Sequence, residues 1–312
     1  MTTMRTKKIK HTFWAELRKN KLLFLMIAPA VLWFFVFSYL PMSGVYLAFT
    51  KFNFIDGLFH SPFVGFRNFE FLFFSGTIGR LIANTVAYNL AFILVGNLFQ
   101  ITCAIILSEI PGRVFRKTSQ SLMFLPYFIS YVMVGVFAYN LLNYSGVVNT
   151  WITALGGRKI SFYTTSGIWK YIIVAFNTWK GLGYGTIVYL AAITSIDPEY
   201  YEVAKISGAS ILQQIRYITL PLLRPMFVFL LLFSLGGIMK GQFDLFYNLI
   251  GSNGLLYSAT DVIDTYVYRA LTVNFDMGMG SAAGLFQSSF GLLMVLGVNF
   301  IVRKIQPDYA LF

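Results

Sequence analysis

Six long apolar segments constrain the fold of this 312-residue chain more than any other feature. Each approaches or exceeds the roughly 20 residues that an α-helix needs to cross a bilayer. They cover residues 22–40, 82–107, 121–142, 168–194, 226–249 and 281–302. Charged residues make up 12% of the chain, whereas soluble domains carry about 25%. The sequence therefore predicts an all-α membrane protein with six transmembrane helices in one domain, residues 22–312, after a basic tail, residues 1–21.

The distribution of lysine and arginine predicts how these helices are oriented. If the N-terminus is cytoplasmic, the cytoplasmic side carries 15 basic residues in the tail, the loops 109–120 and 195–225 and the C-terminal end. The opposite side then carries six. Because cytoplasmic loops are enriched in lysine and arginine, both termini are predicted to be cytoplasmic. This topology accounts for the net charge of +12 without nucleic acid as a partner.

A mostly polar segment, residues 195–225, separates the fourth and fifth predicted helices. Asp197 is a favourable N-cap, and Pro198 suits the first turn of a helix. Gly208 then suits the end of that helix. The segment is therefore predicted to form a helix, a turn and a second short helix on the cytoplasmic side.

The second short helix of this segment carries an apolar stripe. The stripe consists of three isoleucines at positions i, i+4 and i+7: Ile211, Ile215 and Ile218. The prolines of "LPLLRP", residues 220–225, are expected to end the helix, because the residue before a proline disfavours helical backbone. The stripe could pack on the membrane helices of the same chain or dock into a groove on a partner.

The same segment resembles the EAA loop of ABC importer permeases. The family pattern is E-A-A, three residues, G, nine residues, I, one residue and L-P, and this chain departs from it only by valine at the second position. The positions assigned to the loop are Glu202, Val203, Ala204, Gly208, Ala209, Ile218, Leu220 and Pro221. Stretches such as "LPMSGVYLAFTKF" and "FLPYFISYVMVGV" extend the resemblance over nearly the whole chain, to bacterial permeases for polysaccharides and complex oligosaccharides.

The resemblance implies the type I fold of ABC importer permeases and a role without catalysis. The loop would be a coupling helix that sits in a cleft on a separate ATP-hydrolysing subunit, with Glu202 facing a basic group and Gly208 allowing close backbone approach. The implied partners are a second homologous permease, two ATP-binding subunits, an external solute-binding protein and an oligosaccharide. ATP and magnesium would be bound by those subunits, so no cofactor is expected in this chain. The implied location is the bacterial cytoplasmic membrane.

Polar residues inside the predicted membrane helices indicate where a substrate could pass, because such side chains are costly in lipid. Three stretches interrupted by glycine or proline combine aromatic rings with polar groups, which suits the apolar faces and hydroxyls of sugars. The candidate pathway residues are Tyr127, Ser130, Tyr131, Asn177, Trp179, Lys180, Tyr184 and Gln242. Each could instead be structural, with Tyr127 an interfacial aromatic residue and Lys180 one half of an ion pair.

Two further sets of polar residues lie in these helices. Asn89, Asn97 and Gln100 share one face of the second predicted helix and could hold helices together or contact substrate. Lys240 and Asp244 are four residues apart, so on a continuous helix they could form an ion pair.

Two other classes of protein fit the composition less well. A self-sufficient secondary carrier would need an acidic residue for ion coupling, for which Asp244 is the candidate well inside a predicted helix. A membrane enzyme or a metal site would need clustered histidine, cysteine or aspartate, and the chain has two histidines far apart and one cysteine.

Overall fold

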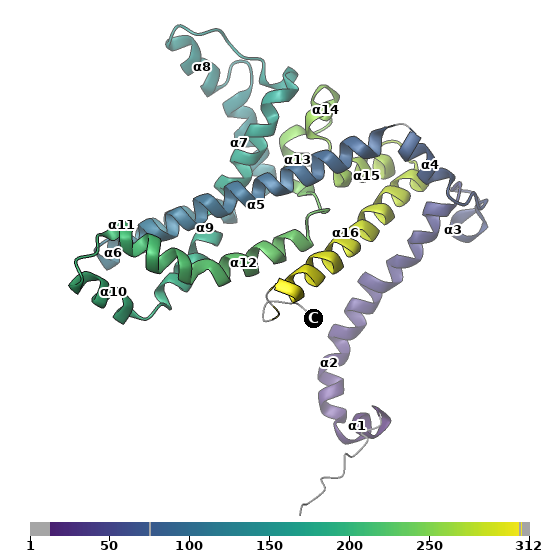
Figure 1. Ribbon diagram of the computed structural model, residues 1–312. Coiled ribbons are helices and arrows are strands. Elements are labelled where there is room, and N and C mark those ends of the chain that lie inside the picture. The colour runs from purple at the N-terminus through teal and green to yellow at the C-terminus, as the bar shows by residue number, and fades with distance from the viewer. Residues whose placement is uncertain (1–12, 75, 306, 308–312) are drawn as a thin grey trace, which may run out of the picture.

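The computed structural model of the protein describes residues 13–74, 76–305 and 307, and these residues form a helical fold (Figure 1). Four basic residues of the predicted tail lie outside the described residues: Arg5, Lys7, Lys8 and Lys10. Five described helices are long and apolar enough to cross a membrane: Lys21–Phe49, Thr77–Glu109, Tyr131–Ala154, Ile211–Gly236 and Met277–Lys304.

The N-terminal part of the first of these helices extends away from the rest of the molecule (Figure 1). After α1 (Phe13–Lys19), α2 (Lys21–Phe34) continues through a π-helical segment, η1 (Phe35–Tyr39), into a 3-10 helix, η2 (Leu40–Phe49). No residue of α2 is buried, and η2 packs against the C-terminal helix α16 (Met277–Ile305). Such a bare apolar helix needs a lipid or protein environment to cover it.

The centre of the molecule is the pair α5 (Thr77–Glu109) and α9 (Trp169–Thr194), which lie against each other along their lengths. Buried side chains of both helices, such as Ala104 and Tyr189, share a core cluster. The helix α9 is not among the five most apolar helices, because polar residues and glycines occupy its middle. Its neighbours α5 and α6 (Arg113–Phe128) cover much of it, which reduces the contact of these polar groups with lipid.

The helices α6 and α9 touch at a glycine. A Cβ atom on Gly183 would lie closer than 3.0 Å to backbone atoms of Met123 and Phe124. Since a backbone atom cannot move aside as a flexible side chain can, this contact needs glycine.

We expect Gly183→Ala to destabilise the protein by about 1–3 kcal/mol, because the added methyl group forces α6 and α9 apart. Thermal unfolding of the detergent-solubilised protein measures the effect. Gly181→Ala is the matched control, since a Cβ atom there meets no atom within 4 Å. Equal thermal midpoints for the two variants would contradict the close packing of α6 on α9.

Two of the predicted membrane segments are each divided into two helices. The segment predicted over 121–142 breaks after Phe128, and Ser130 then caps α7 (Tyr131–Leu142) by accepting a hydrogen bond from the Met133 amide. The segment predicted over 226–249 breaks after α12 (Leu220–Gly236) and resumes as α13 (Phe243–Ile250). Hydropathy detects the apolar runs but not these breaks, because it averages over windows much longer than a break.

Short elements connect the long helices. The helical ones are α3 (Gly57–His60), α4 (Arg67–Phe74), α8 (Val147–Ala154), η3 (Phe162–Thr164), η4 (Ser166–Ile168), η6 (Gly254–Leu256), α14 (Tyr257–Thr260) and α15 (Ile263–Thr272). The helix α15 packs against α5 and α16, and the apolar side chain of Ile263 is fully buried there.

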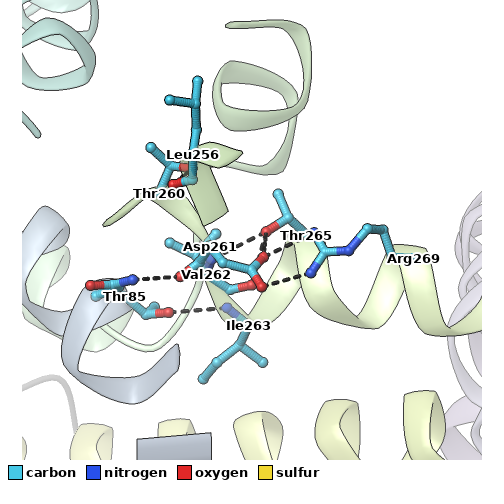
Figure 2. A network of polar contacts seen from close by, with 9 residues as sticks. Thr85, Leu256, Thr260, Asp261, Val262, Ile263, Thr265 and Arg269 are labelled. Atoms are coloured by element: carbon cyan, nitrogen blue, oxygen red, sulfur yellow. Dashed lines mark hydrogen bonds and ion pairs between the residues drawn. The ribbon is translucent and has the colours of Figure 1, made fainter. Parts of the chain in front are cut away.

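A buried polar network joins α15 to α5 (Figure 2). The carboxylate of Asp261, which is 3% exposed, accepts hydrogen bonds from both terminal nitrogens of Arg269, at 3.0 and 2.6 Å. It also accepts one from the Thr265 hydroxyl at 2.8 Å. On the α5 side, the Thr85 hydroxyl accepts a hydrogen bond from the amide of Ile263 at 3.1 Å. The network therefore fixes the start of α15 against α5.

Candidate functional site

The segment that resembles an EAA loop forms two short helices joined by a tight turn. The first is α10 (Pro198–Ile206), and the Asp197 side chain caps it by accepting a hydrogen bond from the Glu199 amide at 3.0 Å. Gly208 has a φ of 78°, in the left-handed region that favours glycine. The second is α11 (Ile211–Gln214). The predicted helix, turn and second helix are therefore present.

The predicted end of the second helix at "LPLLRP" is wrong. The backbone runs from α11 through a π-helical segment, η5 (Ile215–Thr219), directly into α12. Pro221 falls in the first turn of α12, where its missing amide hydrogen loses no bond within that helix. The segment that resembles an EAA loop therefore continues into a predicted membrane helix, and a movement of α11 can be passed to α12 directly.

Part of the apolar surface of the two helices packs against the chain, and the rest is exposed. Ile215 and Ile218 are half-buried, and the Tyr201 hydroxyl forms a hydrogen bond with that of Thr219 at 3.0 Å, which ties α10 to η5. Towards the turn, however, the apolar side chains are exposed: Val203, Ile206, Ile211 and Leu212. Figure 1 shows this tip at one end of the molecule, away from α8 and α14.

A cavity of about 750 Å³ lies between α5, α6, α7, α9 and α12 and the break between α12 and α13. Six of the eight candidate pathway residues line it: Tyr127, Tyr131, Asn177, Lys180, Tyr184 and Gln242. The other two have other contacts. Ser130 caps α7, and Trp179 stacks on Phe137 with 5.9 Å between ring centroids. Whether these residues contact a substrate stays a prediction.

One wall of the cavity is aromatic. The rings of Tyr127 and Tyr184 stack with centroids 5.3 Å apart and an angle of 16° between their planes, and Phe124 stacks on Tyr127 at 5.3 Å. Tyr127 is 46% exposed and Tyr184 is 54% exposed, so both rings present surface to the cavity. Exposed, stacked aromatic rings can cover the apolar face of a sugar ring.

The ion pair suggested for Lys180 is not among the contacts of the described residues. Its ammonium group donates hydrogen bonds to the carbonyl oxygens of Pro126, at 3.3 Å, and Tyr127, at 2.9 Å, and to that of Ile129. It also lies 4.7 Å from the centre of the Tyr131 ring. Because the last carbonyls of a helix lack partners within it, Lys180 stabilises the end of α6. It lines the cavity with its three donors already engaged.

The amide side chains on α5 hold neighbouring segments together. Asn89 donates to the carbonyl oxygens of Ile238 and Lys240, at 2.9 and 3.1 Å, and so secures the break between α12 and α13. Gln100 donates to the Gly181 carbonyl oxygen at 3.3 Å, on α9. Asn97 accepts a hydrogen bond from the Tyr189 hydroxyl. All three amides also line the cavity, so they form its rigid wall.

The predicted ion pair between Lys240 and Asp244 is not among the contacts of the described residues. The helical spacing that would bring the two side chains together is lost, because Lys240 lies in the break before α13 begins. Asp264, on α15, instead faces this break. Its Oδ2 atom accepts hydrogen bonds from the amide of Gly241 at 2.6 Å and from Nε2 of Gln287 at 2.8 Å.

Asp264 was not identified from the sequence, since it lies in a segment predicted to be an external loop. Burial raises the pKa of its carboxyl, while the hydrogen bonds from Gly241 and Gln287 oppose that rise. Gln287 also donates to the Met239 carbonyl oxygen at 2.7 Å. Asp264 and Gln287 therefore connect the break to α15 and α16.

Comparison with known proteins assigns these features to a family. Residues 96–307, about two thirds of the chain, match the family described as the binding-protein-dependent transport system inner membrane component. The chain belongs to this family. It is therefore a membrane permease component of an ABC importer, and its resemblance to sugar-uptake permeases is confirmed.

Two relatives and one solved structure extend the match to almost the full length. Protein LplB of Bacillus subtilis (strain 168) is 32% identical over 298 residues, which is 95% of this permease and 93% of LplB. The polygalacturonan/rhamnogalacturonan transport system permease protein YteP of the same organism is 34% identical, over 93% of this permease and 90% of YteP. A crystal structure of a bacterial ABC transporter involved in the import of the acidic polysaccharide alginate has a chain that is 34% identical. It superposes with a TM-score of 0.85 over 94% of this permease and 99% of that chain, which confirms the type I permease fold.

Proposed function

We propose that this permease carries oligosaccharides across the cytoplasmic membrane of a bacterium as a non-catalytic subunit of an ATP-driven importer. The observation that carries the proposal is the 750 Å³ cavity, whose wall presents the stacked rings of Tyr127 and Tyr184 among amide and hydroxyl groups. Sugar sites combine aromatic surfaces with such polar groups. The relatives support the same substrate class, because YteP is a polygalacturonan/rhamnogalacturonan permease and the structural neighbour imports alginate.

We further propose that the chain crosses the membrane six times, with both termini in the cytoplasm. The crossing to be added to the five apolar helices is α9, which has 26 residues and therefore the length that a bilayer requires. Its polar middle faces the cavity and α6 rather than lipid, since Asn177, Lys180 and Tyr184 all line the cavity. The excess of lysine and arginine on the side of the coupling loop supports this orientation.

The tip of the coupling loop is the proposed contact with an ATP-hydrolysing subunit. Its exposed apolar side chains, Val203, Ile206 and Leu212, lie beside exposed Glu202 on a compact pair of helices. Such a surface fits a groove that has an apolar floor and a basic rim. The direct continuation of α11 into α12 would pass the movement of the ATPase to the cavity wall, to which α12 contributes Leu230 and Ser234.

The complete importer would contain a second permease, two ATP-binding subunits and a solute-binding protein. A solved complex of the alginate transporter with a periplasmic protein that holds an alginate pentasaccharide supports the last of these partners. That chain is 34% identical to this permease, with a TM-score of 0.84. The bare apolar surface of α2 is available for lipid or for the second permease.

Uptake into proteoliposomes that contain the assembled importer tests this function. We expect uptake of oligosaccharides to require ATP and the binding protein, and to proceed without a proton or sodium gradient. Tyr184→Ala is expected to lower the uptake rate at low substrate concentration about tenfold, the effect of losing roughly 1.4 kcal/mol of ring contact.

The matched control is Tyr171→Ala, which removes an exposed tyrosine from the same helix outside the cavity lining. This variant should transport at the unmodified rate. Uptake driven by an ion gradient without ATP would show that the chain is a secondary carrier.

A further inference from the structure

The polar side chains of the cavity fall into two sets, and the first set is already engaged within the chain. Asn89, Gln100 and Lys180 donate to backbone carbonyl oxygens, and Asn97 accepts from Tyr189. Ser234 donates to the Leu230 carbonyl oxygen at 2.8 Å. These groups shape the cavity, and their main hydrogen-bonding capacity is used.

The second set has no side-chain hydrogen bond or ion pair within the described part of the chain. It consists of Asn177, Lys240, Gln242 and the hydroxyl groups of Tyr127, Tyr131, Thr178 and Tyr184. Among these groups Lys240 alone carries a formal charge. Among the described residues that line the cavity there is no aspartate or glutamate.

Lys240 is placed where a passing substrate can reach it. It lies in the nonhelical break between α12 and α13, its side chain is exposed, and the residue lines the cavity. The Asn89 side chain donates a hydrogen bond to the Lys240 carbonyl oxygen at 3.1 Å, and the Asp264 carboxylate accepts one from the next amide, that of Gly241, at 2.6 Å. The backbone that carries this ammonium group is therefore fixed from two sides.

Lys240 has no ion-pair partner among the described residues. The Asp264 carboxylate interacts favourably with Lys240 at a distance, but its Oδ2 atom is occupied by Gly241 and Gln287. An ammonium group beside a cavity within the proposed membrane-spanning region is costly without an anion close to it. A negatively charged ligand in the cavity would supply that anion.

We infer that Lys240 makes the cavity selective for negatively charged oligosaccharides by pairing with an acidic group of the sugar during passage. The inference rests on the proposed function and specifies its substrate class. The tyrosines and amides of the cavity can contact the rings and hydroxyl groups of any sugar. Lys240 adds an electrostatic attraction for acidic sugars alone. A neutral oligosaccharide of the same size leaves the ammonium group unpaired.

The test compares trigalacturonate with its methyl ester, which keeps the sugar units and linkages but removes the charges. Binding to the assembled, detergent-solubilised transporter is measured without the binding protein, so that the selectivity of that protein does not contribute. We expect trigalacturonate to bind at least about tenfold more tightly than the ester, the scale of one charge-assisted hydrogen bond. Lys240→Gln should bring the two affinities within about twofold of each other.

Two control variants separate charge from structure. Lys240→Arg keeps the positive charge and should keep most of the preference for trigalacturonate. Lys170→Gln removes an exposed lysine of α9 that does not line the cavity, and should leave the preference unchanged. A steric effect of the methyl groups would persist in Lys240→Gln, so the loss of preference in that variant identifies the charge.

Four outcomes overturn the inference or its basis. If the ester binds as tightly as the acid, or if Lys240→Gln keeps the full preference, Lys240 does not select for charge. If a neutral trisaccharide such as maltotriose is bound and taken up in preference to trigalacturonate, the proposed function stands and the inference fails. If no oligosaccharide is bound or taken up, the proposed function fails as well.

Discussion

Replacing Glu202 with arginine is expected to release the ATP-hydrolysing subunit and to abolish ATP-driven uptake. Glu202 is exposed on α10, beside the apolar tip residues Val203 and Ile206. An ion pair on an open surface contributes little, but one that is desolvated at an interface costs about 2–5 kcal/mol to break. Reversal of the charge adds repulsion to that loss. The expected decrease in affinity is therefore about 30-fold or more.

Co-purification of the ATPase with the affinity-tagged permease measures this release, and proteoliposome uptake measures its consequence. The matched control is Glu109→Arg, the same charge reversal at an exposed residue at the end of α5, predicted to lie on the same side of the membrane. It should retain the ATPase. Full co-purification and full uptake for Glu202→Arg would show that Glu202 is not part of the docking surface.

Truncation of Arg269 is expected to have the largest effect on stability. Arg269→Ala leaves the Asp261 carboxylate, which is 3% exposed, without its ion-pair partner. Removing one partner of a buried pair costs about 3–5 kcal/mol, because the remaining charge stays desolvated. The guanidinium group also lies 4.0 Å from the centre of the Tyr257 ring, and that contact is lost too. Thermal unfolding of the detergent-solubilised protein measures the change.

A double variant distinguishes the unpaired charge from the loss of packing. Asp261→Asn combined with Arg269→Ala removes both charges, and the amide oxygen can still accept the hydrogen bond from Thr265. This double variant should be more stable than Arg269→Ala alone. The surface control is Arg80→Ala, whose effect should stay within about 0.5 kcal/mol. If the single and double variants unfold at the same temperature, the buried charge is not the cause.

The sequence identified the cavity residues better than it identified their roles. The glycine and aromatic pattern of 177–185 marked Asn177, Lys180 and Tyr184, and all three line the cavity. The role of Lys180 depends on the carbonyl oxygens of Pro126 and Tyr127, more than 50 residues earlier. A pattern along one helix contains no information on which neighbouring helix ends beside it.

The helix breaks were predicted with uneven success. Pro126 indicated a weakened helix, and α6 ends two residues later at Phe128, before Ser130 caps α7. The glycines of "GGIMKGQFDLF" indicated the interruption that follows Gly236, whereas the prolines at 221 and 225 suggested a stop that does not occur. Proline has opposite effects in the first turn and in the interior of a helix, so its consequence depends on where the helix starts.

The sequence by itself determined that the chain enters a membrane, where its apolar helices lie, and that a polar helix–turn–helix separates two of them. These properties depend on the hydrophobicity of consecutive residues and on short-range backbone preferences, such as the cap at Asp197 and the left-handed turn at Gly208. Only the tertiary structure decided that Asp264 holds Gly241 and that Lys240 is left to face the cavity. Those roles arise from contacts between segments far apart in the chain, and packing alone determines which donors are engaged and which remain available.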